Sequence, residues 1–344
     1  MQQLTYTGPD ALEWREAPAP RLTSDAAALV RPVAVATCDL DALIVAGASP
    51  FRPPFALGHE CVAEVIELGD AASAGGAGAL TPGTLVSVPF QISCGQCAAC
   101  VQGRTSNCCE VPFMSSYGFG PAVEQWGGFL SDVVCVPYAE HMLVPLPSGL
   151  APAAVASASD NISDAWRAVG PQLAQRSGAP VLVVGGAGPG SIGLYAAAIA
   201  VALGAESVLY VDTDERRRAT AATLGARTLG EIPERVEQCP ITVDSSNDPR
   251  GLALALRSTA PDGECTSTSI YFGEQPSLPL LEMYTKGITF KTGRTNARPA
   301  IPHVLALAAS GALRPELVTT RTVAWADAPA ALLERDWTKL VIER

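Results

Sequence analysis

Basic residues are scarce in this chain. Its 344 residues include 23 lysines and arginines against 34 aspartates and glutamates, which gives a formal net charge of −11. Because polyanions are repelled by such a balance, we expect neither nucleic acid nor an anionic membrane surface as a partner. A small-molecule ligand, neutral or cationic, fits this charge better.

A basic leader and an uninterrupted apolar run are also lacking. The first ten residues show no basic start followed by an apolar stretch, so we expect no secretory signal and a cytoplasmic location. Residues 179–205 carry no charge and are long enough to span a bilayer, but glycines and Pro189 interrupt them near their start. A strand, a glycine turn and a helix fit this segment better.

The pattern of apolar residues changes along the chain and indicates two domains in an α/β protein. Up to about residue 146, short apolar runs broken by proline and glycine indicate an irregular antiparallel β domain; examples are residues 27–35, 61–68 and 85–90. From about residue 153, strand and helix patterns alternate, as in a doubly wound parallel sheet. The expected strands are 181–184, 208–211, 241–243, 268–272 and 288–292, and the expected helices are 192–203, 215–224 and 298–310. Strands at 318–323 and 340–342 return to the first domain.

The ten cysteines include a cluster with the spacing of a metal site. In a cytosolic chain cysteines are more often ligands or core residues than disulfides. Four thiolates in one short lobe can close a tetrahedral shell around a structural Zn²⁺, and the C-x2-C-x2-C-x7-C run supplies Cys94, Cys97, Cys100 and Cys108. Cys109 is adjacent to this run and competes with Cys108, which the spacing favours.

Histidine is rare, so an imidazole-based metal site has few candidates. Only three histidines occur, and His59 lies in a Gly-His-Glu step with Cys38 and Asp41 upstream. A set of Cys38, His59 and a carboxylate leaves a fourth position for water or substrate, as in a catalytic zinc site. Asp41 then orients the imidazole through its second nitrogen.

A glycine-rich loop between a strand and a helix predicts a dinucleotide site. The G-x-G-x-x-G run brings bare backbone to a pyrophosphate at a helix N-terminus, and its residues with the preceding glycine are Gly186, Gly188, Gly190, Ser191, Ile192 and Gly193. Asp212, 19 residues past Gly193, would accept bonds from a ribose diol and repel a 2′-phosphate, so NAD is favoured over NADP. Arg217, between Arg216 and Arg218, reverses this preference if it faces the cofactor. Arg294 belongs to a polar cluster with Asn296 and Arg298 that faces either cofactor, substrate or solvent.

In this order the three motifs resemble the zinc-containing medium-chain alcohol dehydrogenases over essentially the whole chain. The resemblance implies a GroES-like catalytic domain over 1–155 and 295–344, with a structural zinc lobe at about 94–109, and a Rossmann domain over 156–294. It further implies two zinc ions per chain and hydride transfer between NAD(P) and an alcohol, aldehyde or ketone. Members of the family are dimers or tetramers.

The resemblance also assigns the remaining catalytic ligands. The family's third zinc ligand precedes the helix that links the domains, and the Ser-Asp step here resembles members with an aspartate ligand related to formaldehyde dehydrogenases. We therefore assign Asp160, with Asp164 as the rival ligand and a helix N-cap as the alternative role of Asp160. Glu60 exchanges with water at the metal in this interpretation.

One departure from the family affects the expected reaction. Leu40 stands where a serine or threonine usually takes the proton of the substrate hydroxyl. Asp39 and Asp164 are the remaining candidate acceptors, and Asp164 is preferred because one helical turn would separate it from Asp160. Reduction of an imine or activated alkene, and a dinucleotide-binding protein without turnover, are the alternative functions. Phe90, Trp126, Tyr117 and Trp166 are candidate pocket residues.

Overall fold

This computed structural model describes residues 1–344 except 74–79, 120–125, 187 and 274. The chain divides into a first unit of residues 1–163, 296–309 and 319–344 and a second unit of residues 164–295 and 310–318. Residues 156–163 thus group with the first unit, because their side chains bond to its strands: the hydroxyl of Ser159 accepts the N–H of Cys61 at 2.8 Å. Within the described residues, no helix has both the length and the apolar character needed to cross a bilayer.

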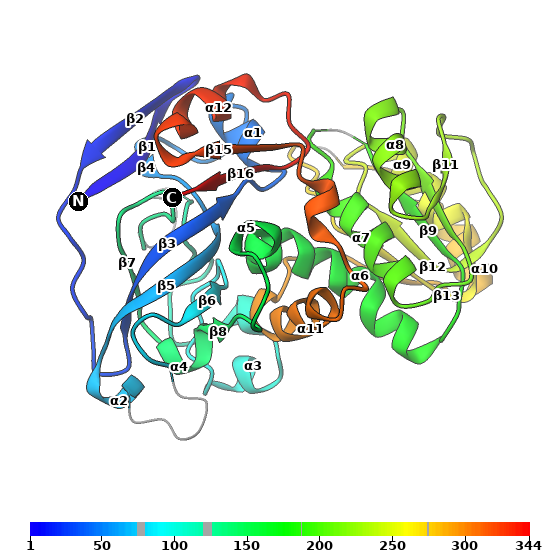
Figure 1. Cartoon of the computed structure of the whole chain (residues 1–344). Coiled ribbons are helices and arrows are strands. Elements are labelled where there is room, and N and C mark those ends of the chain that lie inside the picture. Colours follow the sequence, from blue (N-terminus) through cyan, green and yellow to red (C-terminus); the bar gives the residue numbers. More distant parts are fainter. Residues whose placement is uncertain (74–79, 120–125, 187, 274) are drawn as a thin grey trace. The chain divides into compact units, whose positions relative to one another are not determined.

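The first unit is built on two β-sheets (Figure 1). The smaller sheet has the order β2-β1-β4, from Ala11–Glu16, Gln2–Gly8 and Phe55–Ala56. The larger follows β15-β16-β3-β5-β6-β8, with β7 paired to β3; these strands are Arg321–Ala324, Leu340–Glu343, Ala28–Ala36, Glu60–Leu68, Leu85–Val88, Val144–Pro145 and Val134–Val136. Strand β16 pairs antiparallel with β3, so the end of the chain returns to this unit as expected.

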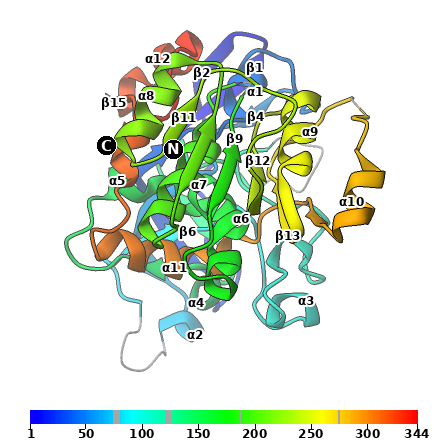
Figure 2. The ribbon, with the colours of Figure 1, turned by 90° about the vertical axis from the view of Figure 1, so that its right-hand side faces the viewer.

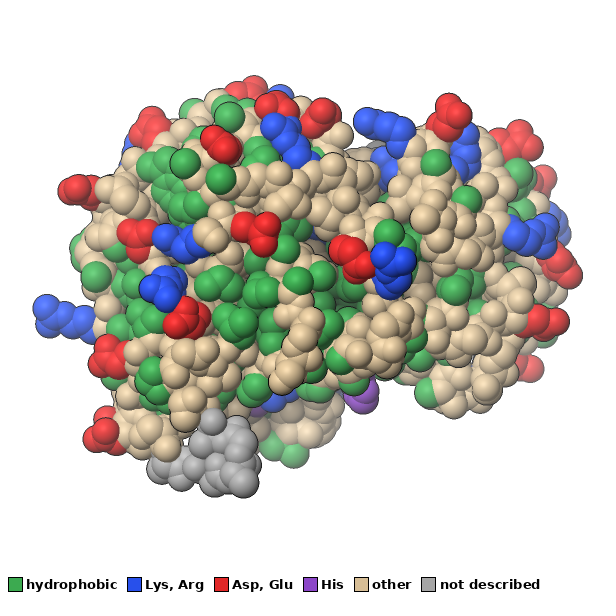
Figure 3. Space-filling view, viewed as in Figure 1, with side chains coloured by type: hydrophobic (Ala, Val, Ile, Leu, Met, Phe, Trp, Pro, Cys, Tyr) green, Lys and Arg blue, Asp and Glu red, His purple; other side chains and the backbone are tan. Residues whose placement is uncertain are grey.

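Short helices connect the strands of the first unit. They are α1 Asp41–Val45, α2 Asp70–Ser73, α3 Ala98–Val101, α4 Ala139–Met142, α5 Pro152–Val155, α11 Ala297–Ala309 and α12 Ala328–Glu334, with 3₁₀ turns η1 Thr105–Asn107, η2 Ala156–Ser159 and η4 Trp325–Asp327. An apolar core of strand and helix residues, including Tyr6, Phe129 and Met142, holds them together. On the face drawn in Figure 3, acidic and basic side chains of the described residues are interspersed, and neither sign forms a continuous patch.

The pairing of β3 with β5 determines where the site lies. Ala36 at the end of β3 lies opposite Glu60 at the start of β5. Cys38 follows the first strand and His59 precedes the second, so both side chains emerge at the same end of the sheet. The register shifts at Pro32, which cannot donate a ladder hydrogen bond.

The second unit is a six-stranded parallel sheet with the order β11-β10-β9-β12-β13-β14 (Figure 2). Its strands are Arg227–Leu229, Val208–Val211, Val181–Val184, Cys239–Asp244, Thr259–Ser267 and Thr289–Lys291, and its helices are α7 Ser191–Ala202, α8 Glu215–Thr223, α9 Pro249–Arg257 and α10 Leu280–Lys286, with η3 at Pro315–Val318. Helix α6, Asn161–Gln175, leads into it. The connections reverse direction between β9 and β12, and ligands of such sheets bind beyond the carboxyl ends of the strands at this point.

Two expected strands are misplaced. No strand covers 268–272; β13 ends at Ser267, and Ile270 and Phe272 are exposed. The paired part of β13 is buried through the small side chains of Cys265, Thr266 and Ser267, which carry little apolar signal. Similarly, β15 begins at Arg321, because residues 315–318 form the η3 turn.

Candidate functional site

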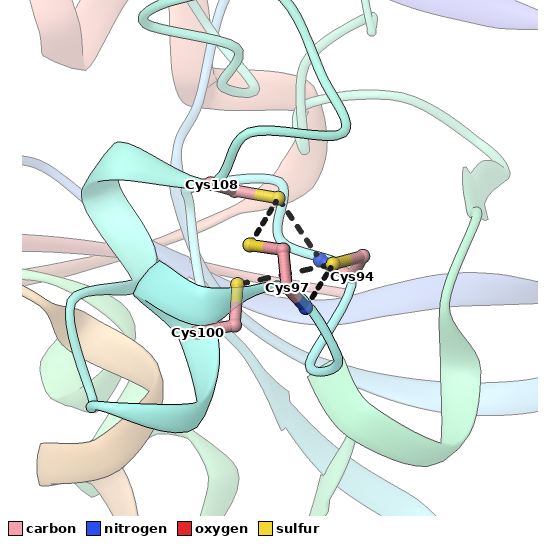
Figure 4. Close-up of side chains that lie close together, drawn as sticks. All are labelled: Cys94, Cys97, Cys100 and Cys108. Carbon is pink, nitrogen blue, oxygen red and sulfur yellow. Dashed lines mark hydrogen bonds between the residues drawn. The ribbon is translucent and has the colours of Figure 1, made fainter.

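Four cysteines converge in the first unit (Figure 4). The sulfurs of Cys94 and Cys100 lie 4.0 Å apart, and those of Cys97 and Cys108 lie 3.9 Å apart. The N–H groups of Cys97 and Gln96 donate to the Cys94 sulfur, and hydrogen bonds from the N–H groups of Cys109 and Cys100 lower the pKa of Cys97 to about 6. Thiolates held by backbone donors at this separation fit a tetrahedral metal ion.

Cys109 lies outside this group. It is exposed, and its sulfur contacts the carbonyl of Asn107 at 3.7 Å, so Cys108 supplies the fourth sulfur. The lobe is also supported from the start of α11: Asn296, the residue before this helix, accepts the N–H of Ser106 at 2.9 Å, and Arg298 within it donates to the carbonyl of His141 in α4. Of the polar cluster that the sequence left open, Asn296 therefore contacts the lobe, and Arg298 contacts α4.

A second group joins Cys38, His59 and Asp160. All three are buried, and one ligand atom from each lies within 4.8 Å of the others. The His59 Nε2 is 3.7 Å from Asp160 Oδ2, and neither ring nitrogen has a hydrogen-bond partner among the described residues. Burial lowers the pKa of His59 to about 4, which leaves a neutral imidazole. A fully buried, unpartnered imidazole between a thiol and a carboxylate fits a metal ligand.

Asp41 holds this arrangement from the first turn of α1. One carboxylate oxygen accepts the N–H of Cys38 at 2.7 Å, and the other lies 3.7 Å from Nδ1 of His59. Burial raises the pKa of Asp41 to about 7. The sequence predicted this orienting role, and the structure brings the two side chains together without a direct hydrogen bond.

Glu60 is next to His59 but is held by other partners. Its carboxylate accepts hydrogen bonds from Ser157, from the N–H of Asn161 at 3.2 Å, and from Lys339 at 3.1 Å. Lys339 also donates to the carbonyl of Thr37 and is completely buried. Sequence reasoning missed Lys339, although a lone lysine at the start of an apolar strand was an available signal. Glu60 does not join the ligand group that the structure defines.

Aromatic side chains flank the imidazole. The ring centroids of Phe119 and Phe90 lie 4.6 and 5.9 Å from that of His59. Phe90 was a predicted pocket residue and Phe119 was not. Tyr117 instead lies in the core against Phe129, with its hydroxyl donating to a carbonyl.

Asp164 lies in the first turn of α6, four residues after Asp160. Asp160 directly precedes this helix, and its own backbone, with φ −149° and ψ −83°, is not helical. The carboxylate of Asp164 pairs with Arg167, which also donates to the carbonyl of Ser267. Asp39, the other candidate acceptor, lies 3.5 Å from the side-chain amide of Asn161. Leu40 directly precedes α1, and its N–H lies 3.5 Å from the Cys38 sulfur.

The glycine loop occupies the carboxyl end of β9 in the second unit. Gly188 and Gly190 have positive φ, and Gly190 precedes the first residue of α7, Ser191. A side chain at Gly186 would collide with the backbone of Ser246, and Gly193 packs near Tyr210. A glycine-rich loop at the N-terminus of a buried helix is the local structure that a pyrophosphate site needs.

Asp212 directly follows β10 beside this loop, and its carboxylate is fully engaged. It accepts hydrogen bonds from the Tyr210 hydroxyl at 2.8 Å, the Asp214 N–H at 2.9 Å, and Arg217 at 2.7 and 2.9 Å. The same guanidinium donates to the carbonyls of Gly186 and Gly188. Arg294, the remaining predicted cofactor residue, lies beyond β14, and burial lowers its pKa.

Comparisons with known proteins agree with this arrangement. Residues 24–148 match the alcohol dehydrogenase GroES-like domain, and residues 191–310 match the zinc-binding dehydrogenase domain, together more than half of the chain. A protein of Mycobacterium tuberculosis described as a probable zinc-binding alcohol dehydrogenase is 26% identical over 331 residues, 94% of this chain and 82% of its own length. The glutathione-independent formaldehyde dehydrogenase of Pseudomonas aeruginosa is 32% identical over 234 residues; the match spans 64% of this chain and 56% of that relative.

A solved structure shares the fold of the whole chain. The alcohol dehydrogenase of Thermus sp. ATN1 superimposes with a TM-score of 0.88 at 29% identity, covering 100% of this chain and 99% of that one. The GroES-like domain and the Rossmann domain expected from the sequence are thereby confirmed. The chain belongs to the zinc-containing medium-chain alcohol dehydrogenase and reductase family, a family of oxidoreductases.

Proposed function

We propose that this chain transfers hydride between a nicotinamide dinucleotide and a small alcohol, aldehyde or ketone at a zinc ion held by Cys38, His59 and Asp160. The observation that carries the proposal is the buried His59 imidazole, unpartnered among the described residues and enclosed by a thiol and a carboxylate. When bound, zinc supplies a Lewis acid and the dinucleotide a hydride donor or acceptor.

The protein's own groups prepare the site for this chemistry. Asp41 accepts the N–H of Cys38 and lies beside Nδ1 of His59. These two contacts hold both ligands in orientation. The Phe90 and Phe119 rings shield the imidazole from water and offer an apolar wall to the carbon chain of a substrate. Lys339 neutralises Glu60, so the acid beside the ligand set adds little net charge to it.

A second zinc is proposed for the cysteine lobe. Four sulfurs leave no position for substrate, so this metal would be structural. Its role would be to fix the lobe, which is also held by the hydrogen bond from Ser106 to Asn296, close to the contact of Ser93 with His141 at 3.0 Å.

The sequence predicts NAD in preference to NADP, on the basis of a free Asp212 carboxylate. That carboxylate is already paired with Arg217, so the preference for NAD stays a prediction, which the relative affinities for NADH and NADPH would test. A dimer or tetramer is the proposed assembly; Leu280, Leu281 and Tyr284 expose their apolar surface on α10, which supports contact with a second copy.

Leu40 favours a second candidate function, the reduction of an imine or activated alkene. An alcohol substrate must lose a hydroxyl proton, and the side chain at position 40 cannot accept it. Hydride addition to an imine or alkene takes its proton from solvent and requires no hydroxyl at this position.

The test combines metal analysis with a turnover screen. The purified protein should contain about two zinc equivalents and should turn over at least one alcohol, aldehyde, ketone or imine with NAD(H) or NADP(H). His59→Gln should remove one zinc equivalent and all turnover while the protein stays folded. His303→Gln, an exposed histidine of α11, is the matched control. Full turnover by a His59→Gln protein that lacks the zinc of the Cys38, His59 and Asp160 group would contradict the proposal.

A further inference from the structure

A cavity of about 370 Å³ lies in the first unit, between β1 and the segment that leads into β7. This volume is far larger than the roughly 10 to 15 Å³ that a single buried water needs. The cavity has room for a small organic molecule. None of the candidate metal ligands Cys38, His59 and Asp160 is among the described residues that line it. It therefore lies outside the site described above.

The pairing of β1 with residues 130–132 directs one hydroxyl toward this cavity. Gln3 lies opposite Ser131 in an antiparallel bridge, so their side chains share one face, and both line the cavity. The neighbouring Leu4 and Leu130 are buried in the apolar core on the other face. Ser131 is 1% exposed, and its Oγ has no hydrogen-bond partner among the described residues.

A second polar atom in the same wall also lacks a partner. The indole N–H of Trp126 is buried, and it makes no hydrogen bond to any described residue. The segment is held close to β4, because a side chain at Gly128 would collide with the carbonyl of Leu57. Buried donors are nearly always paired in native proteins, with protein, water or ligand. Two unpaired groups on the wall of one cavity indicate an occupant that accepts hydrogen bonds.

The charge of the wall indicates that this occupant is an anion. Indole and guanidinium groups donate hydrogen bonds and never accept them, and Trp126 and Arg21 supply one of each. No acidic residue is among the described residues that line the cavity, although acids outnumber bases in the chain as a whole. The carboxylate next to Ser131, that of Asp132, has other partners: it accepts the N–H of Gln2 at 2.6 Å and Arg344 at 3.0 Å.

We propose that this cavity is a binding site for a small organic carboxylate. The carboxylate accepts hydrogen bonds from the Ser131 hydroxyl and the Trp126 indole, and the exposed Arg21 guanidinium supplies the counter-charge. The apolar part of the ligand packs against apolar side chains of the wall, among them Pro20, Val133 and Val134. This site uses neither the metal nor the dinucleotide, so it does not rest on the proposed function.

NMR of protein labelled with ¹⁵N at the tryptophan side chains tests the proposal directly. Hexanoate and hexanamide are suitable probes, because they are similar in size and only the first is charged. Hexanoate should shift the indole N–H resonance of Trp126, which is identified by its loss in Trp126→Phe, with a Kd below about 1 mM. Hexanamide should bind at least about tenfold more weakly, because it offers no charged acceptor.

Matched variants assign the binding to this cavity. Ser131→Ala removes one donor and Arg21→Ala removes the counter-charge, so each should weaken hexanoate binding at least about fivefold. Arg31→Ala removes an exposed arginine of the same unit that pairs with Glu64, and it should leave the affinity within about twofold. His59→Gln should also leave it within about twofold, which excludes binding of the carboxylate to a metal held by His59.

Three results would overturn the proposal. A Trp126 resonance that does not move at about 20 mM hexanoate would show that only water fills the cavity. Equal affinities for hexanoate and hexanamide, or wild-type affinity in both Ser131→Ala and Arg21→Ala, would exclude a carboxylate site here. Loss of binding in His59→Gln would place the carboxylate at the metal group. Thermal melting checks folding, and Ser131→Ala removes a single oxygen, so a folding defect in Arg21→Ala would not leave the question open.

Discussion

The ammonium group of Lys339 lies 3.1 Å from a carboxylate oxygen of Glu60, and both side chains are completely buried. Two charges without access to water are stable only as a pair. The backbone carbonyl of Thr37 and the Ser157 hydroxyl complete their hydrogen bonds. Removing either member leaves the other charge buried beside the ligand set.

Lys339→Met should therefore be strongly destabilising. We expect a loss of about 3 to 5 kcal/mol in the free energy of unfolding, measured by urea titration, because the Glu60 carboxylate loses its counter-charge. Lys291→Met is the control: that lysine pairs with Glu264 at the surface, where such a pair contributes less than about 1 kcal/mol. The double variant Lys339→Met with Glu60→Gln should recover part of the loss. Equal effects of the two single lysine variants would contradict this account.

Cys97→Ser should remove the structural metal. Zinc content should fall from about two equivalents to about one, and the melting temperature should fall by about 6 °C or more, because loss of a structural metal costs several kcal/mol. Cys109→Ser, whose sulfur lies outside the group, should change neither quantity. Unchanged zinc in Cys97→Ser would show that the lobe is not a metal site.

Acid should destabilise the protein in part through His141. Burial and the nearby Arg298 lower the pKa of His141 from 6.5 to about 4, so the folded state binds this proton less readily than the unfolded state. As the pH falls from about 6.5 to about 4, the unfolded chain takes up a proton that folded His141 does not, and the free energy of unfolding decreases. His141→Gln should show a shallower decrease over this window in urea titrations at fixed pH. An identical pH dependence in variant and wild type would rule out this contribution.

Leu40→Ser should separate the two candidate reactions. If alcohol oxidation is limited by the missing hydroxyl, this variant should oxidise alcohols at least about tenfold faster, since proton transfer by a placed group contributes roughly 10²- to 10⁴-fold. Imine reduction should not increase. Leu43→Ser, at a partly buried leucine of α1, controls for the lost apolar contact. No gain in alcohol oxidation would favour the imine or alkene as substrate.

Local motifs were predictable from the sequence, because their residues are held together by a few intervening residues. The four cysteines from Cys94 to Cys108 are close in the sequence and therefore form one lobe. The glycine loop is defined by the strand before it and the helix after it. The third ligand, Asp160, followed only from the resemblance to a family. The proton-acceptor role of Asp164 stays a prediction, and its carboxylate already pairs with Arg167 in the structure.

Long-range pairs and side-chain competition were not predictable. Lys339 and Glu60 are separated by 279 positions in the sequence, and no spacing rule connects them. The motif around Asp212 indicated a ribose acceptor. Whether Arg217 pairs with that carboxylate depends on the rotamer of the Arg217 side chain, which the sequence does not determine. Strand β13 was missed because its paired residues are small and polar, while the apolar residues after it are exposed.

The antiparallel pairing of β16 with β3 has a consequence for synthesis on the ribosome. Cys38, His59 and Asp160 all emerge before the second half of the chain is made, yet the partner that neutralises Glu60 is contributed by residue 339. A nascent chain halted before that residue would have to bury an uncompensated carboxylate next to the ligands, which disfavours the closed site. Metal loading at the Cys38, His59 and Asp160 group should therefore follow completion of the chain.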